Sequence, residues 1–256
     1  MDFYSKTNLN GKTAVISGAA RNIGKAFAEA LASVGANVCL VDTDQINVYN
    51  TTQQIACKYN VRTSSYAVDI TQQEKTAELM SEIYMKYGSI DICVANAGIF
   101  ISESAENMST ETWSKIINVN LTGAFYTAQA AAHYMIKHKK GSIIFTTSIS
   151  AHQASKAPSC AYSASKGGLL TLVHDLANEW GKYNIRVNSI SPGNIDTGML
   201  TNEWRATYQH DCELETVIGR LGKTEELQGA LIYLASDISS YTTGAEIVVD
   251  GGYIIK

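Results

Sequence analysis

The sequence predicts an α/β protein with a doubly wound, seven-stranded parallel sheet and helices on both faces. Short β-like runs alternate with longer helical segments along almost all of the 256 residues. Strands that alternate with helices of about 10–15 residues indicate βαβ crossovers, which make the strands parallel and cover both faces of the sheet. No proline-rich linker, charge block, low-complexity tract or internal repeat divides the chain. We therefore expect a single domain over residues 1–256.

The expected strands are short runs of apolar and β-branched residues. They lie at residues 13–16, 38–41, 65–68, 90–94, 142–145, 185–190 and 246–249. Helical patterns occupy most of the intervals between them. These helices are expected at residues 23–34, about 45–58, a segment ending near 87, about 111–137, and a segment ending near 180.

The stretch from about Gly193 to Arg220 interrupts this alternation. It is helix-prone, contains Met199, Trp204 and Tyr208, and follows the sixth expected strand. Segments at the carboxyl ends of strands shape pockets in open α/β sheets. We interpret residues 193–220 as a substrate lid, and a packing excursion is the alternative.

Composition and charge narrow the class of protein. The chain is 45% hydrophobic and 17% charged, so it can bury a sizeable core. A net charge of -4 argues against nucleic acid or an anionic membrane as a partner. The amino end has no apolar signal region and no run of about 18 apolar residues occurs. Five cysteines without metal-ligand spacing indicate buried free thiols in a reducing cytoplasm, and we expect no metal.

A glycine-containing turn follows the first expected strand. Ser17 to Gly24 opens the first expected helix, where small residues let the backbone approach a pyrophosphate and the helix supplies free N–H groups and a positive dipole. Asp42 ends the second strand, 24 residues after Gly18. This is close to the spacing of about 20 expected of a carboxylate that binds a ribose hydroxyl. A capping or turn aspartate is the alternative.

Tyr162 and Lys166 are the candidate acid/base pair. In a helix they lie one turn apart on one face, and Ser148 lies 14 residues before the tyrosine. A nearby ammonium favours the phenolate. To work as a base near pH 7, a tyrosine must lower its pKa from about 10, which requires about 4 kcal/mol. An ordinary amphipathic helix is the alternative, so the assignment depends on the surrounding motifs.

Over essentially its whole length the chain resembles the short-chain dehydrogenase/reductase family. The family's turn, T-G-x-x-x-G-x-G, is matched by Ser17, Gly18 and Gly24, with Asn22 in place of the middle glycine. Asparagine tolerates left-handed dihedral angles better than most residues, so the turn can form. Residues 192–197 match the family's P-G-x-x-x-T segment. The resemblance implies a Rossmann fold and an NAD(P)-dependent oxidoreductase that acts on CH–OH groups.

The resemblance also implies the cofactor contacts. They include an adenine-edge pair after the third strand, a segment lining the cleft after the fourth, and two residues that hold the nicotinamide carboxamide. The whole set is Ser17, Gly18, Arg21, Asn22, Ile23, Gly24, Asp42, Asp69, Ile70, Asn96, Ala97, Gly98, Tyr162, Lys166, Pro192, Gly193, Ile195 and Thr197.

Arg21 and Asp42 point to different cofactors. A basic residue at the position of Arg21 often marks NADP enzymes of this family. Asp42 would face a 2′-phosphate directly, and like charges repel. Arg21 can instead point to solvent or pair with a neighbouring carboxylate. We therefore expect NAD rather than NADP.

The resemblance assigns four catalytic residues. Tyr162 exchanges a proton with the substrate oxygen. Lys166 depresses the pKa of Tyr162 and hydrogen-bonds the nicotinamide ribose. Ser148 orients the alcohol or carbonyl, and Asn120 helps hold a water that relays protons to the lysine. Each also has a structural alternative: Ser148 could cap a strand end and Asn120 could satisfy a helix backbone.

The carboxyl half is most similar to the polyol and ketose branch of the family, so a sugar alcohol and its ketose are the expected substrates. The candidate substrate residues are Ser150, His152, Asn194 and Met199, with Gln153 as a further polar candidate. A solvent-facing role is the alternative for His152. A 3-oxoacyl thioester reductase and a catalytically silent NAD-sensing protein are the alternative functions. The family is commonly tetrameric, and a cytoplasmic homotetramer is expected.

Overall fold

The computed structural model describes residues 3–197, 210 and 214–256. Its main sheet has seven parallel strands in the order β3-β2-β1-β4-β5-β6-β9. These are β1 (Thr13–Ser17), β2 (Asn37–Asp42), β3 (Thr63–Ala67), β4 (Ile92–Ala95), β5 (Gly141–Thr146), β6 (Ile185–Pro192) and β9 (Glu246–Val249). The strand order reverses between β1 and β4, which opens a crevice at the carboxyl ends of these strands. The predicted sheet is confirmed.

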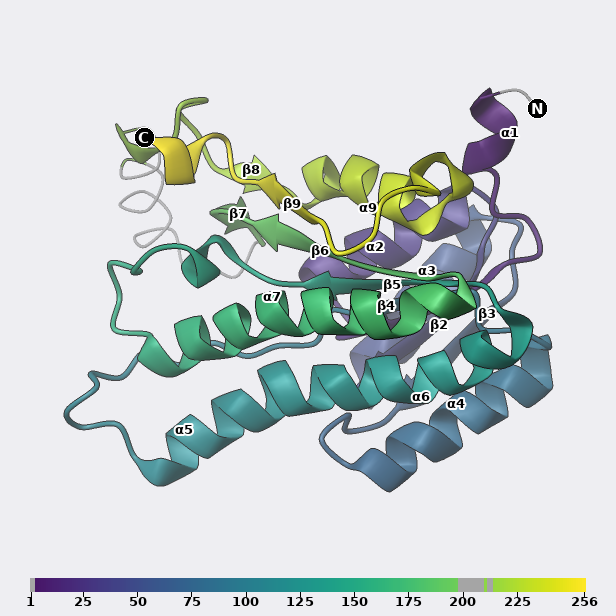
Figure 1. Ribbon diagram of the computed structural model, residues 1–256, viewed down its shortest axis with the longest axis horizontal. Helices are drawn as coiled ribbons and strands as arrows, with labels where there is room; N and C mark the ends of the chain where they lie inside the picture. Colours follow the sequence, from purple (N-terminus) through teal and green to yellow (C-terminus); the bar gives the residue numbers. More distant parts are fainter. Residues whose placement is uncertain (1–2, 198–209, 211–213) are drawn as a thin grey trace.

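Helices cover both faces of the sheet, as predicted (Figure 1). One face packs against α2 (Asn22–Ser33), α3 (Gln45–Lys58) and α9 (Gln228–Ala235). The other packs against α4 (Gln73–Tyr87), α6 (Ala124–His138) and α7 (Cys160–Trp180). The short α1 (Phe3–Thr7) lies at the far end from the carboxyl terminus (Figure 1).

The strands have continuous apolar runs because both of their faces are buried. In β1, Ala14 and Ile16 pack in one core cluster and Val15 packs in the other, and all three are fully buried. Alternate residues of a strand point to opposite faces, so a two-sided core requires apolar residues at consecutive positions.

The helix expected at 111–137 is wrong in one respect. It is divided into α5 (Thr110–Ile117), a π-helical segment (Asn118–Gly123) and α6. A π-helical turn adds a residue to the helical repeat, and such turns frequently occur at functional sites. A second sheet, which pairs β7 (Ile195–Asp196) with β8 (Gly222–Lys223), was not expected because two-residue strands leave no periodic pattern.

Two sequence expectations are only partly addressed by the described residues. Met199 and most of the proposed lid lie outside them. Among the cysteines, Cys39 and Cys93 are buried free thiols, and burial raises the pKa of each to about 12. Cys57 and Cys160 are free but exposed, which corrects the expectation of burial for these two. Within the described part of the chain, no helix is long and apolar enough to cross a membrane.

Candidate active site

The site lies at the carboxyl edge of the sheet, where the chain leaves β5 and enters α7. Ser148 follows β5, and its Oγ accepts a hydrogen bond of 3.1 Å from the backbone N–H of Ser150. Tyr162 lies in the first turn of α7 and forms a hydrogen bond with Ser148. Lys166 lies one turn further, with its Nζ 5.6 Å from the centre of the Tyr162 ring. The structure therefore brings together the three residues singled out from the sequence.

Burial dominates the electrostatics of this group. Lys166 is 3% exposed and its Nζ donates a hydrogen bond of 2.7 Å to the carbonyl oxygen of Thr146. Burial lowers the pKa of Lys166 to about 8. Burial also raises the pKa of Tyr162, and the hydrogen bond with Ser148 only partly opposes this. The expectation that Lys166 depresses the tyrosine pKa is not met here, because burial is the largest cause acting on the Tyr162 pKa and the Lys166 ammonium donates to the Thr146 carbonyl oxygen.

Asn120 lies in the π-helical segment and is fully buried. Its Nδ2 donates to the carbonyl oxygen of Ile99 at 3.0 Å and to Ser165 Oγ at 3.1 Å. Its Oδ1 accepts from the N–H of Ile99 at 2.8 Å. Asn120 thus connects the loop after β4 to α7. The backbone groups with which its side chain forms hydrogen bonds belong to this loop and not to a helix. A Cβ on Gly98 would lie 3.5 Å from Lys166 Nζ, so this loop passes directly over the lysine.

The turn after β1 is tightly packed in the way that a phosphate cradle requires. Gly18 has φ +66°, and a Cβ there would lie 2.7 Å from Ala97 Cα. A Cβ on Gly24 would lie 2.0 Å from the Gly18 carbonyl oxygen. Asn22 has φ +54°, which confirms that asparagine takes the left-handed conformation expected of the missing glycine. Asn96 Nδ2 braces the turn through the carbonyl oxygens of Ser17 and Gly18, at 3.0 and 3.2 Å.

Asp42 is fixed beside this turn. Its Oδ2 accepts from the N–H of Ala20 at 3.0 Å, and its Oδ1 accepts from the N–H of Asp44 at 3.1 Å. Asp44 caps α3, and hydrogen bonds from Asn47 lower its pKa, with a further contribution from the charge of Arg21. Arg21 therefore has the Asp44 carboxylate as a neighbour, which agrees with the expectation that Arg21 can pair with a nearby acidic residue. The glycine contacts, the free amino end of α2 and the fixed Asp42 fit a dinucleotide.

The remaining predicted cofactor residues lie on the same edge. Asp69 Oδ1 accepts from the N–H and Oγ1 of Thr71, at 2.9 and 2.8 Å, and Ile70 is buried. Gly193 donates from its N–H to the Val249 carbonyl oxygen at 3.0 Å. The set is completed by Ile23 on α2, Ala97 after β4, Pro192 at the end of β6, Ile195 in β7 and Thr197 after β7.

His152 has a partner that the sequence did not reveal. Its Nε2 lies 2.8 Å from Glu246 Oε1, at the start of β9. The Glu246 carboxylate also accepts from Ser191 Oγ, which lies 2.5 Å from Thr147 Oγ1. This series of hydrogen bonds connects Thr147, directly before Ser148, with His152 in the loop after Ser148. In the sequence, the signal for this contact is Glu246, a charged residue at the start of the otherwise apolar segment 246–249. Ser150 lies in the same loop, and Asn194 follows β6 at this edge.

Taken together, the crevice and the Ser148–Tyr162–Lys166 group have the arrangement expected of a dinucleotide-dependent α/β enzyme with an acid/base centre. Comparison with known proteins specifies this further. A family model described as enoyl-(acyl carrier protein) reductase matches residues 18–254. The chain belongs to the short-chain dehydrogenase/reductase family of oxidoreductases.

Several relatives align over nearly the whole chain. Sorbose reductase of Schizosaccharomyces pombe is 38% identical over 97% of this chain and 98% of its own length. An NAD-dependent glycerol dehydrogenase of Listeria innocua is 36% identical over 99% and 98%. A 3-oxoacyl-[acyl-carrier-protein] reductase of Thermotoga maritima is 36% identical over 96% and 99%. A crystal structure of a short-chain dehydrogenase/reductase from Mycobacterium marinum has a TM-score of 0.93, with 36% identity over 98% of this chain and 99% of that one.

Proposed function

We propose that the protein interconverts a sugar alcohol and its ketose with NAD as cofactor. The observation that carries this proposal is the Ser148–Tyr162–Lys166 group, together with the Asp42 carboxylate held beside the glycine turn by the backbone N–H groups of Ala20 and Asp44. When bound, the nicotinamide dinucleotide accepts hydride from the alcohol carbon, or returns it to the ketone. The residues of the chain then have to orient the substrate oxygen and move its proton.

Each residue has a task that follows from its position. Ser148 Oγ can hold the substrate oxygen next to Tyr162, with which it already hydrogen-bonds. Tyr162 Oη gives a proton to that oxygen in reduction and takes one in oxidation. Lys166 supplies a positive charge next to the phenol, and Asn120 supports the lysine by fixing the loop after β4. We propose that Asn120 also helps to hold a water that relays protons to Lys166.

The raised pKa of Tyr162 predicts how the rates of oxidation and reduction depend on pH. At pH 7 the phenol is protonated, which is the form required to reduce a ketone. Oxidation of an alcohol requires the phenolate, whose population rises about tenfold per pH unit below the pKa. We expect the oxidation rate to rise steadily from pH 7 to 9 and the reduction rate to change little. A flat oxidation profile over this interval would contradict the role of Tyr162.

The preference for NAD depends on Asp42. The carboxylate is held in place by two backbone N–H groups, so it cannot swing away from a 2′-phosphate without losing both. Relatives include NAD-dependent and NADP-dependent enzymes, so kinship alone does not select the cofactor. Removal of the carboxylate, as in Asp42→Ser, should weaken selection for NAD.

Polyol recognition is supported by the polar groups after Ser148. His152 and Ser150 lie in the loop that leaves Ser148, and Glu246 at the start of β9, two strands away from β5, holds the His152 ring. The sorbose reductase and glycerol dehydrogenase relatives agree with a polyhydroxylated substrate. Reduction of a 3-oxoacyl thioester is the second candidate, because a relative of similar identity carries that name.

Absorbance of reduced nicotinamide tests the proposal. Purified protein is assayed with NAD and NADP separately against pentitols, hexitols, ketoses and a 3-oxoacyl ester. Turnover of a polyol with NAD is expected, and Tyr162→Phe should lose it while binding NAD normally. Tyr241→Phe is the matched control because Tyr241 is fully exposed. Preference for NADP would refute the argument from Asp42, and absence of any hydride transfer would favour an NAD-sensing protein.

We also propose that the protein is a cytoplasmic homotetramer. The helices at about 111–137 and 158–182 and the carboxyl end would form its contacts, and closed homo-oligomers are common among soluble enzymes. Trp113 of α5 is 43% exposed, which leaves an aromatic surface for a contact. Light scattering after size exclusion should give four times the mass of 27.7 kDa, and a monomer would contradict the proposal.

A further inference from the structure

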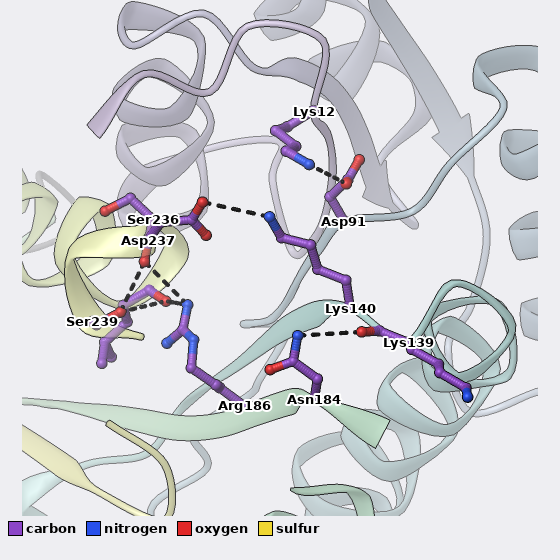
Figure 2. Close-up of polar contacts among 10 residues, drawn as sticks. Lys12, Asp91, Lys139, Lys140, Asn184, Arg186, Ser236, Asp237 and Ser239 are labelled. Atoms are coloured by element: carbon purple, nitrogen blue, oxygen red, sulfur yellow. Dashed lines mark hydrogen bonds and ion pairs between the residues drawn. The ribbon is translucent and has the colours of Figure 1, made fainter. Parts of the chain in front are cut away.

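A recess of about 180 Å³ lies at the amino-terminal edge of the sheet, on the opposite edge from Tyr162. It is bordered by the segment before β1 and by the starts of β4, β5 and β6. No residue assigned above to cofactor, substrate or catalysis lines it. Figure 2 shows part of its polar lining, including Lys12, Asp91, Lys140, Arg186 and Asp237.

Positive charge is concentrated in this recess. Four basic residues line it, Lys6, Lys12, Lys140 and Arg186, against two acidic ones, Asp91 and Asp237. The lining therefore has an excess of two positive charges, although the whole chain has a net charge of -4. Clefts lined by one sign of charge attract ions of the opposite sign.

Of the two carboxylates, Asp91 already accepts hydrogen bonds from three neighbouring groups. Asp91 accepts from Lys12 Nζ at 3.0 Å, from the N–H of Thr13 at 2.9 Å and from Ser89 Oγ at 2.6 Å. Its side chain is 17% exposed. Asp91 therefore neutralises Lys12 and fixes the start of β1, and it offers little charge to the other cations of the recess.

Asp237 lies near two of the other cations, Lys140 and Arg186. Lys140 Nζ lies 3.4 Å from Asp237 Oδ2, and these side chains are 49% and 65% exposed, so solvent screens the pair. Arg186 uses Nη2 to donate to the carbonyl oxygens of Leu234 and Ser236, at 2.7 and 3.2 Å. Its Nη1 is buried and donates to no acceptor among the described residues. Burial lowers the pKa of Arg186, so an added anion would favour its charged form.

We propose that this recess binds a small oxyanion with more than one negative charge, of the phosphate type, between Lys6, Lys140 and Arg186. The volume supports a small ligand. Pockets for cofactor-sized molecules measure about 300–1,000 Å³, whereas 180 Å³ corresponds to about six water volumes. A phosphate group fits this space and a second dinucleotide does not.

Binding would join parts of the chain that are far apart in sequence. Lys6 belongs to α1, Lys140 precedes β5, and Arg186 holds the carboxyl end of α9. An anion between them stabilises the folded state because the unfolded chain does not present these groups together. The expected readout is thermal stability and requires no substrate, so the outcome is independent of the proposed enzyme activity.

The test is a titration of the full chain with sodium phosphate, with sodium chloride keeping the ionic strength constant. Thermal midpoints are recorded with and without saturating NAD, because phosphate could also occupy the glycine turn. We expect a saturable rise in midpoint that persists with NAD. Lys140→Gln should raise the dissociation constant for phosphate about tenfold or more, because a charge-assisted hydrogen bond is lost.

Lys139→Gln is the matched control. It removes the same charge from the neighbouring position, and the Lys139 side chain points away from the Lys140–Asp237 pair in Figure 2. It should bind phosphate like the wild type, and Lys140→Arg should retain binding. Three results would overturn the proposal: a midpoint that follows ionic strength alone, equal losses in Lys139→Gln and Lys140→Gln, or a response that disappears with NAD.

Discussion

Replacing Lys166 by methionine should stabilise the protein at pH 7 while abolishing catalysis. Lys166 is 3% exposed, and burial lowers its pKa from 10.5 to about 8. Holding the charged ammonium in the fold at pH 7 therefore costs about 3 kcal/mol. Methionine removes this cost, but leaves the Thr146 carbonyl without its hydrogen bond, a loss of about 1 kcal/mol. The net gain of about 2 kcal/mol should raise Tm by roughly 4–8 °C.

The pH dependence separates this effect from a change in packing. In the unfolded chain the lysine keeps its pKa of 10.5, so between pH 8 and 10.5 the unfolded state binds more protons than the native state. The free energy of unfolding of the wild type therefore rises with pH through this window. The rise from pH 7 to pH ~9.5 is about 2 kcal/mol. The methionine variant cannot gain it, so the two proteins should become about equally stable at the higher pH.

Equilibrium unfolding in urea at both pH values measures this difference. Lys137→Met is the matched control, because Lys137 is exposed on α6 and its ammonium lies 5.0 Å from the centre of the Tyr134 ring. The control should show no gain at pH 7 and no change with pH. The reasoning is refuted if Lys166→Met is less stable than the wild type at pH 7, or if its gain is the same at both pH values.

Substitutions at three further positions test the cofactor turn and the loop after Ser148. Gly24→Ala should lower the free energy of unfolding by about 2–3 kcal/mol, because the new Cβ would lie 2.0 Å from the Gly18 oxygen; unchanged urea unfolding would contradict the close packing. Asn22→Ala should cost about 1 kcal/mol more than Asn22→Gly, since φ is +54° here; equal losses would argue against the left-handed turn. Glu246→Gln should raise the KM of the preferred polyol up to about fivefold, because the carboxylate that holds the partly exposed His152 ring becomes an amide; an unchanged KM would remove His152 from the substrate site.

The fold could be predicted because its determinants are local in sequence. A strand buried on both faces must be apolar at every position, as Ala14, Val15 and Ile16 are, and this pattern is readable without knowledge of its partners. The left-handed conformation of Asn22 was also predictable, because it depends on the backbone preference of one residue in a recognisable turn.

The polar contacts could not be predicted because they depend on strand neighbours. His152 and Glu246 are 94 residues apart and meet because β9 pairs with β6 and β6 with β5. The pKa of Tyr162 was expected to fall because the spacing places Lys166 nearby. Spacing says nothing about desolvation, which acts on both groups and raises the pKa of the tyrosine.

The π-helical segment shows how the sheet packing and the site depend on one another. Ile116 is the buried residue of α5, and Ala128 and Met135 are buried in α6. At about 100° per residue, an uninterrupted α-helix would place Ile116 about 120° from Ala128 and about 100° from Met135, on different faces. One additional residue in a π-helical turn shifts the phase by about 100° and returns all three to one face. Asn120 lies inside this turn, where its amide reaches Ile99 and Ser165. The π-helical turn therefore keeps the buried residues of α5 and α6 on one face, and through Asn120 it holds the loop after β4 over Lys166. An amphipathic sequence pattern does not predict such a turn.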